Sequence, residues 1–132
     1  MKKYLLIDDD NIFNFIHGEV IRKVDPDADI ITYNSSSEGL EYIESLAASN
    51  ERLPDFLFLD IRMPEMTGFE LLERLKSIPE DQLRIMKIFL LTSSLDERDQ
   101  AKAEESVLVI DLKSKPLTPA NLSDILKQNY DL

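Results

Sequence analysis

Carboxylate side chains close two short apolar runs of this chain, and their types and spacing suit metal and phosphoryl chemistry. Asp8, Asp9 and Asp10 follow the first run, and Asp60 follows the second. If both runs are neighbouring buried strands, these acids converge at one edge of a sheet. Clustered carboxylates repel one another unless a cation sits among them. A hard divalent metal beside a nucleophilic aspartate would form the outline of a phosphoryl-transfer site.

Two later strand ends would bring further polar groups to the same edge. Thr92 and Ser93 follow one apolar run, and Lys115 follows another. In open parallel α/β sheets, ligands bind beyond the carboxyl ends of the strands. Taken singly, these residues and Asp60 have ordinary structural explanations, and we expect Asp10 to cap the first helix. Their joint placement at four strand ends favours one functional site.

The elements that must position these residues alternate along the chain. Short apolar runs with little alternation predict strands buried on both faces, while one more alternating run predicts an edge strand. The predicted buried strands are Tyr4–Ile7, Phe56–Leu59, Ile88–Leu91 and Val107–Leu112, and the edge strand is Asp29–Tyr33. Amphipathic segments between them give the order βαβαβαβαβα. Right-handed crossovers then predict a parallel sheet with helices on both faces.

Helix starts are indicated by capping signals. Ser35, Thr67 and Ser94 each stand three residues before a glutamate, which is the capping-box pattern. Thr118 before Pro119 predicts the start of the last helix, since proline suits the first helical position. The first helix is predicted over 12–24 from an apolar stripe at helical spacing. That stripe is Phe13, Ile16, Val20 and Val24.

The predicted helix over 95–106 differs from the others. Its apolar residues are Leu95, Ala101 and Ala103, set among seven charged residues. A helix with so little apolar surface to bury should be weakly held and easily shifted.

Length and composition set further bounds. The 132 residues predict a single domain, 1–132, without an attached output domain. A net charge of −11, from 26 acids and 15 bases that are spread along the chain, argues against nucleic-acid binding. The absence of cysteine excludes disulfides and thiol chemistry. No apolar stretch reaches membrane-spanning length, so we expect a cytoplasmic protein without membrane contact.

Four motifs, in this order and spacing, resemble the receiver domain of bacterial response regulators. They are Asp8-Asp9, the run Asp60–Pro64 with Gly68 after it, Thr92-Ser93, and Lys115-Pro116. The resemblance spans residues 4 to about 130. It implies a flavodoxin-like (βα)5 three-layer sandwich with strand order 2-1-3-4-5. It also implies a stand-alone response regulator of a two-component or phosphorelay pathway, which is a phosphoacceptor rather than an enzyme acting on other molecules.

The resemblance assigns roles to the clustered residues. Asp60 would accept a phosphoryl group from a phosphohistidine of a sensor histidine kinase or phosphotransfer protein. Mg²⁺ would be held by Asp9, Asp60 and the backbone carbonyl of Arg62, with Asp8 acting through water. Such a site suits magnesium, which takes few carboxylates and keeps several waters.

Further residues would serve the phosphoryl group and the loops around it. Lys115 would pair with phosphoryl oxygens, together with the Thr92 hydroxyl and the backbone N–H of Ser93. The bond from Lys115 to Pro116 is expected to be cis. Met63 and Pro64 are expected to shape the loop, and Gly68 to permit a close backbone approach.

One position departs from the family pattern. Leu112 stands where receivers carry an aromatic residue that reads out the state of Thr92. We therefore expect readout to rest on Thr92 and the helix over 95–106. Arg62 and Ser94 flank the expected path of hydrolytic water and should tune acyl-phosphate lifetime. His17 is expected at the surface or partly packed, without a phosphotransfer role.

Output would pass to a separate downstream protein, or the phosphoryl group would be passed onward. The expected contact face combines the helix over 95–106, strand 107–112 and the last helix. One alternative is a haloacid-dehalogenase-type phosphatase, which needs Asp-x-Asp-x-Thr. Ile12 stands where its threonine should be, and Arg62 stands where the second acid would follow Asp60. The other alternative is a receiver-like module that works unphosphorylated, against which the complete set of acids and the lysine argues.

Overall fold

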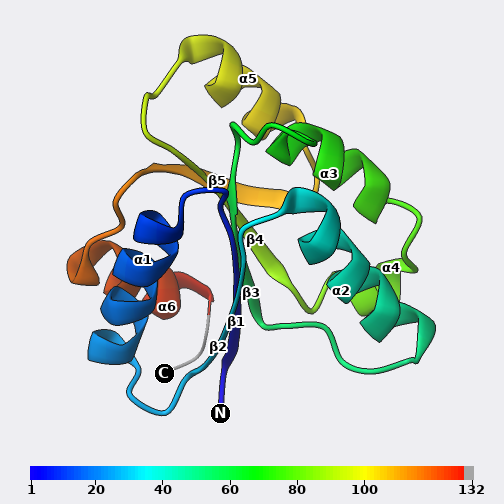
Figure 1. The fold of residues 1–132 in the computed structure, drawn as a ribbon, viewed down its shortest axis with the longest axis horizontal. Helices are drawn as coiled ribbons and strands as arrows, with labels where there is room; N and C mark the ends of the chain where they lie inside the picture. The colour runs from blue at the N-terminus through cyan, green and yellow to red at the C-terminus, as the bar shows by residue number, and fades with distance from the viewer. Residues whose placement is uncertain (130–132) are drawn as a thin grey trace.

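A computed structural model describes residues 1–129 and shows one five-stranded parallel sheet of order β2-β1-β3-β4-β5 (Figure 1). The strands are β1 Lys3–Ile7, β2 Asp29–Tyr33, β3 Phe56–Asp60, β4 Lys87–Thr92 and β5 Val109–Ser114. This confirms the flavodoxin-like α/β architecture and the strand order. As predicted, β2 lies at an edge. The last strand, β5, was predicted to be buried on both faces, but it forms the other edge and is only partly buried.

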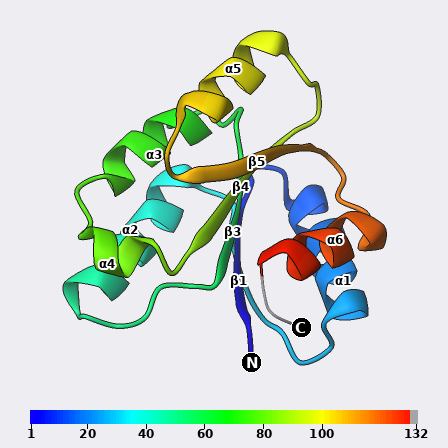
Figure 2. The same cartoon turned by 180° about the vertical axis from the view of Figure 1, so that it is seen from behind.

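In the part of the chain that the structure describes, six helices cover the two faces of the sheet. In both views α1 and α6 lie on one side, and the other four lie on the opposite side (Figures 1 and 2). The helices are α1 Asn11–Val24, α2 Ser36–Ala48, α3 Gly68–Leu75, α4 Glu80–Leu83, α5 Glu97–Glu105 and α6 Pro119–Asn129. The short α4 was not predicted. Within residues 1–129 no helix has both the length and the apolar character needed to cross a bilayer.

Each face of the sheet has its own hydrophobic core. Facing α1 and α6, the rings of Tyr4, Phe56, Phe58 and Phe89 pack together, with Tyr4 stacked on Phe56 at 5.2 Å between centroids. Aliphatic side chains of the same strands fill the opposite face beneath α2 and α3. Since β1, β3 and β4 are buried on both faces, their carboxyl ends are fixed in the middle of the molecule.

Four capping predictions were correct, including that of Asp10 at the start of α1, and the one for α5 was wrong. Ser35 caps α2, Thr67 forms a reciprocal capping box with Glu70, and Thr118 accepts a hydrogen bond from the backbone N–H of Asn121 at the start of α6. The residue that caps α5 is Asp96, not Ser94, because its carboxylate accepts from the backbone N–H of Arg98. The helix therefore begins two residues later than the Ser94 pattern indicated.

The last strand is also shifted from its predicted position. The apolar run suggested Val107–Leu112, but β5 spans Val109–Ser114, and Val107 is 92% exposed. An irregularity in the β4–β5 register falls between Ile88 and Phe89. The shift carries Lys115 to the position directly after the strand, where its backbone N–H donates to the Thr92 carbonyl at 2.8 Å.

Candidate functional site

Three carboxylates meet at the carboxyl ends of the two central strands. Parallel pairing aligns Ile7 of β1 with Leu59 of β3, so the residues that follow them are neighbours. Carboxylate oxygens of Asp8, Asp9 and Asp60 all lie within 4.8 Å of one another. Asp8 and Asp60 are buried and Asp9 is exposed, so the cluster opens to solvent on one side.

Lys115 from the end of β5 joins this cluster. Its Nζ donates to Asp8 Oδ2 at 2.9 Å and to Asp60 Oδ1 at 3.2 Å, and all three side chains are at most 5% exposed. The same ammonium lies 4.2 Å from the centroid of the Phe13 ring, a cation–π contact from α1. Lys115 thus compensates two buried carboxylates at once.

Burial and charge set the protonation of this group. Burial, followed by the charge of Asp8, raises the pKa of Asp60 to about 7 against the opposing effect of Lys115. Burial alone would lower the pKa of Lys115, but hydrogen bonds and charge from Asp8 and Asp60 outweigh it and raise that pKa. One ammonium therefore does not fully compensate the two buried acids, and a further cation would favour ionised Asp60.

Backbone and amide contacts fix Asp8 and the turn that follows it. Asp8 Oδ1 accepts from the backbone N–H of Asp10 at 2.9 Å, and Asn14 Nδ2 donates to the Asp8 carbonyl at 3.0 Å. Asp10 caps α1 through the N–H of Ile12, as predicted. The turn from β1 into α1 is therefore held at both its side chains and its backbone.

The loop after Asp60 is held by a close backbone approach. A Cβ on Gly68 would lie 2.6 Å from the backbone oxygen of Asp60, and the Gly68 N–H donates to the Ile61 carbonyl at 2.9 Å. The prediction that Gly68 permits close contact is confirmed. Met63 is buried in the core while Pro64 is exposed, so this loop is anchored through the methionine.

The hydroxyl side of the site has a different arrangement. Thr92 is buried at the end of β4, where its Oγ1 donates to the Ser94 carbonyl at 3.0 Å and accepts from the Ser94 N–H at 3.3 Å. Ser93 and Ser94 are exposed. The Thr92 hydroxyl is thus engaged by its own loop. The peptide bond before Pro116 is cis, as predicted.

Comparison with known proteins decides the family. The profile of the response regulator receiver domain matches residues 4–127. The chain belongs to the response regulator receiver family. Receiver domains serve two-component signalling, in which they interact with histidine kinases or phosphotransfer proteins.

Individual relatives agree with this assignment. A two-component response regulator from Cytophaga hutchinsonii is 36% identical, with a TM-score of 0.87 over 97% of this chain and 96% of that one. Chemotaxis protein CheY4 of Vibrio cholerae, at 21% identity, shares the fold with a TM-score of 0.78 over 98% and 99% of the two chains. A protein-glutamate methylesterase/protein-glutamine glutaminase of Desulfotalea psychrophila is 32% identical over 96% of this chain. The receiver chain spans about a third of that relative's length (34%).

The acid cluster of this receiver has the chemistry that magnesium prefers. Its donors are carboxylate oxygens from three aspartates, and hard oxygen ligands suit Mg²⁺. Receiver domains bind Mg²⁺ at such an acidic pocket. Burial and the charge of Asp8 raise the pKa of Asp60 despite Lys115, so additional positive charge at the cluster would stabilise its ionised form.

Several residues around the receiver site were missed or misjudged from sequence. The predicted α1 stripe is only half-buried, and the buried residues are Asn14, His17, Gly18 and Ile21. The prediction for His17 was wrong, because the side chain is 2% exposed and its Nε2 accepts from the Leu117 N–H at 3.2 Å. Asn14 lies in the first turn of α1, and its amide next to the apolar Phe13 was the available signal.

The elements that we expected to carry readout also differ from prediction. Leu112 is half-buried and packs against the aliphatic core. The expected α5 anchors Leu95 and Ala101 are exposed, whereas Ala103 is buried. The carboxylate of Asp99, one of the seven charged residues of this segment, is also buried.

Proposed function

We propose that this receiver accepts a phosphoryl group onto Asp60 from a phosphohistidine, and signals by protein contact or by onward transfer. The observation that carries the proposal is Lys115 Nζ, which bridges the buried carboxylates of Asp8 and Asp60. A buried acid beside a fixed ammonium is poised to hold the additional anionic oxygens of a phosphoryl group.

Phosphoryl transfer to Asp60 would form one bond to phosphorus and break another. An Asp60 carboxylate oxygen attacks phosphorus and forms the O–P bond, while the P–N bond to the donor imidazole breaks and its electron pair stays on that nitrogen. The product is an acyl phosphate on Asp60. Lys115 is placed to pair with the phosphoryl oxygens, provided that it gives up a present carboxylate partner. The Thr92 hydroxyl and the Ser93 N–H are proposed to donate to phosphoryl oxygens alongside Lys115.

Mg²⁺ would be held by Asp9, Asp60 and the Arg62 carbonyl, with Asp8 acting through water. When bound, it offsets the repulsion between the carboxylates and the incoming anion. For the Thr92 hydroxyl to reach a phosphoryl oxygen, it must first leave the Ser94 carbonyl. The Thr92 hydroxyl would therefore donate to the Ser94 carbonyl before phosphorylation and to a phosphoryl oxygen after it.

The proposed output surface consists of α5, β5 and α6. Leu95 and Ile110 are exposed there, at 52% and 45%. Because the exposed apolar side chains belong to the edge strand and to the loop leading into α5, a partner could contact them without disturbing the central strands. Ser94 and Arg62, at the mouth of the site, are proposed to tune acyl-phosphate lifetime.

The test is incubation with acetyl phosphate and Mg²⁺ followed by intact mass measurement. We expect a gain of one phosphoryl group that requires the metal and is absent from Asp60→Asn. Asp10→Asn is the matched control, since asparagine caps a helix as well as aspartate does and Asp10 lies outside the cluster. A gain that persists in Asp60→Asn would reject Asp60 as acceptor, and no gain in any sample would favour a module that works unphosphorylated.

A further inference from the structure

An ion pair joins the loop after Asp60 to α5, 37 residues away in sequence. The Arg62 guanidinium donates to Asp99 Oδ2. The two ends of this pair differ in exposure, since the Arg62 side chain is 64% exposed and the Asp99 side chain only 7%. A carboxylate in a buried position depends strongly on its partner, because water cannot replace it.

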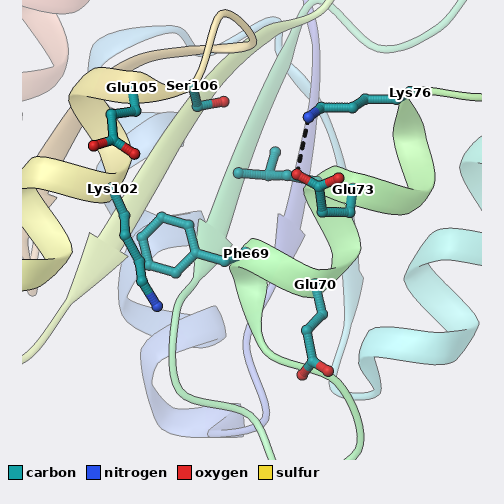
Figure 3. Close-up of a pocket in the computed structure, with 8 residues that line it drawn as sticks. Phe69, Glu70, Glu73, Lys76, Lys102, Glu105 and Ser106 are labelled. Carbon is teal, nitrogen blue, oxygen red and sulfur yellow. Dashed lines mark hydrogen bonds and ion pairs between the residues drawn. The ribbon is translucent and has the colours of Figure 1, made fainter.

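Other contacts hold α5 only lightly. Within Glu97–Glu105 the buried side chains are Asp99 and Ala103. A cavity of about 420 Å³ separates α5 from α3. Lys102 reaches across it from α5 towards Phe69 on α3, with Nζ 5.4 Å from the ring centroid (Figure 3). With so little apolar burial, a charged contact can decide where this helix sits.

The position of Arg62 connects this contact to the acid cluster. Arg62 follows Asp60 by two residues, and the intervening Ile61 is fixed by backbone hydrogen bonds to Leu91 and Gly68. Under the proposed function the Arg62 carbonyl is a metal ligand while its guanidinium holds Asp99, so an ion at the cluster would act on the same residue that contacts α5. Leu112 has no ring with which β5 could report a change at Asp60.

We propose that Asp99 is a positioning residue for the loop after Asp60, acting through Arg62, and that this pair couples occupancy of the acid cluster to the position of α5. The coupling rests on the proposed function, in which Asp60 and the Arg62 carbonyl are metal ligands. It is reciprocal, so an occupied cluster shifts α5, and a partner that repositions α5 changes the affinity of the cluster for its cation.

The first test measures how far the Arg62–Asp99 ion pair holds α5, without metal or phosphoryl donor. Native-state amide hydrogen exchange in α5 should be roughly three- to fivefold faster in both Arg62→Gln and Asp99→Asn, as expected for loss of a partly exposed ion pair. Arg62→Lys should restore part of the protection. Arg52→Gln is the matched control, because Arg52 is similarly exposed and pairs with the largely buried carboxylate of Asp55 just before β3, so its loss should leave α5 exchange unchanged. Equal exchange in wild type and Arg62→Gln would show that the ion pair does not hold α5 in place.

The second test measures the coupling with Mg²⁺ alone. Titration of the wild type should shift amide resonances of Asp9 and Asp60 and, with the same midpoint, those of Asp99 and Ala103. Arg62→Gln should keep the cluster shifts and lose at least half of the α5 shifts. Cluster shifts without an α5 response in the wild type, or an α5 response unchanged in Arg62→Gln, would overturn the coupling alone. No shifts at the cluster would overturn the proposed metal site and the coupling with it.

Discussion

The two sides of the site are held in place very differently. On the carboxylate side, Asp8 and Asp60 end strands buried on both faces, and ion pairs, amide contacts and the Gly68 approach fix them. On the hydroxyl side, the buried Thr92 leads into an exposed loop and a helix with a single buried apolar residue, Ala103. The difference separates chemistry from readout. Under the proposed function, Asp60 as nucleophile needs fixed geometry, whereas α5 as reporting element must move at small energetic cost.

The largest expected contrast between the two sides is in the cost of removing an apolar side chain. Leu57→Ala in β3, where the residue is fully buried, should lower the free energy of unfolding by about 4 kcal/mol. Leu95→Ala, at a residue 52% exposed, should change it by less than about 0.5 kcal/mol. Urea unfolding measures both. Similar losses in the two variants would show that the loop before α5 is packed as firmly as the central strands.

The backbone approach at Gly68 should be the next most costly feature to disturb. Gly68→Ala places a Cβ against the backbone oxygen of Asp60, which cannot rotate away, and should destabilise by about 3 kcal/mol. Gly18→Ala is the matched control. Its Cβ would meet only the end of the Arg22 side chain at 3.4 Å, and alanine favours helix by about 0.5–1 kcal/mol. A loss in Gly18→Ala as large as that in Gly68→Ala would contradict this account.

The same contrast explains what sequence could predict. The strands of the carboxylate side and the caps at Ser35 and Thr67 follow from local pattern, because apolar runs and capping boxes act within a few residues. The start of α5 was predicted wrongly, since Ser94 and Asp96 are both good caps and the bond between Thr92 and Ser94 decides between them. The burial of Asp99 depends on a contact 37 residues away, which no local pattern contains.

On the firmly held carboxylate side, buried His17 makes the stability of the protein depend on pH. Burial lowers the pKa of His17 to about 4; the charge of Asp8 acts in the opposite direction, and Lys115 acts in the same direction as burial. The unfolded chain, with a histidine pKa near 6.5, therefore binds a proton between pH 6.5 and 4 that the folded protein does not. Stability is fully present above that window and is lost as the pH falls through it. The contribution of His17 to this loss should be about 2 kcal/mol between pH 7 and pH 5.

His17→Gln isolates that contribution. Glutamine has an amide oxygen that can accept from the Leu117 N–H in place of Nε2, but it does not titrate. The difference in unfolding free energy between wild type and His17→Gln should therefore change by about 2 kcal/mol from pH 7 to pH 5, with the wild type losing more. Parallel pH profiles for the two proteins would mean that His17 has the same pKa in the folded protein as in the unfolded chain.

The smallest expected effect falls on the loosely held side, at the contact between α5 and α3. Lys102→Met removes the charge that lies over the Phe69 ring and should weaken the attachment of α5 by about 0.5 kcal/mol, or roughly a twofold rise in its hydrogen exchange. Lys76→Met is the control from the same cavity, because Lys76 pairs with Glu73 on its own side and should leave α5 unaffected (Figure 3). If Lys102→Met instead accelerated α5 exchange more than Arg62→Gln, the contact with α3 rather than the Arg62 pair would set the position of this helix. The Arg62 pair would then contribute less than the Lys102 contact to the position of α5, and coupling from Asp60 through its own loop would be correspondingly weak.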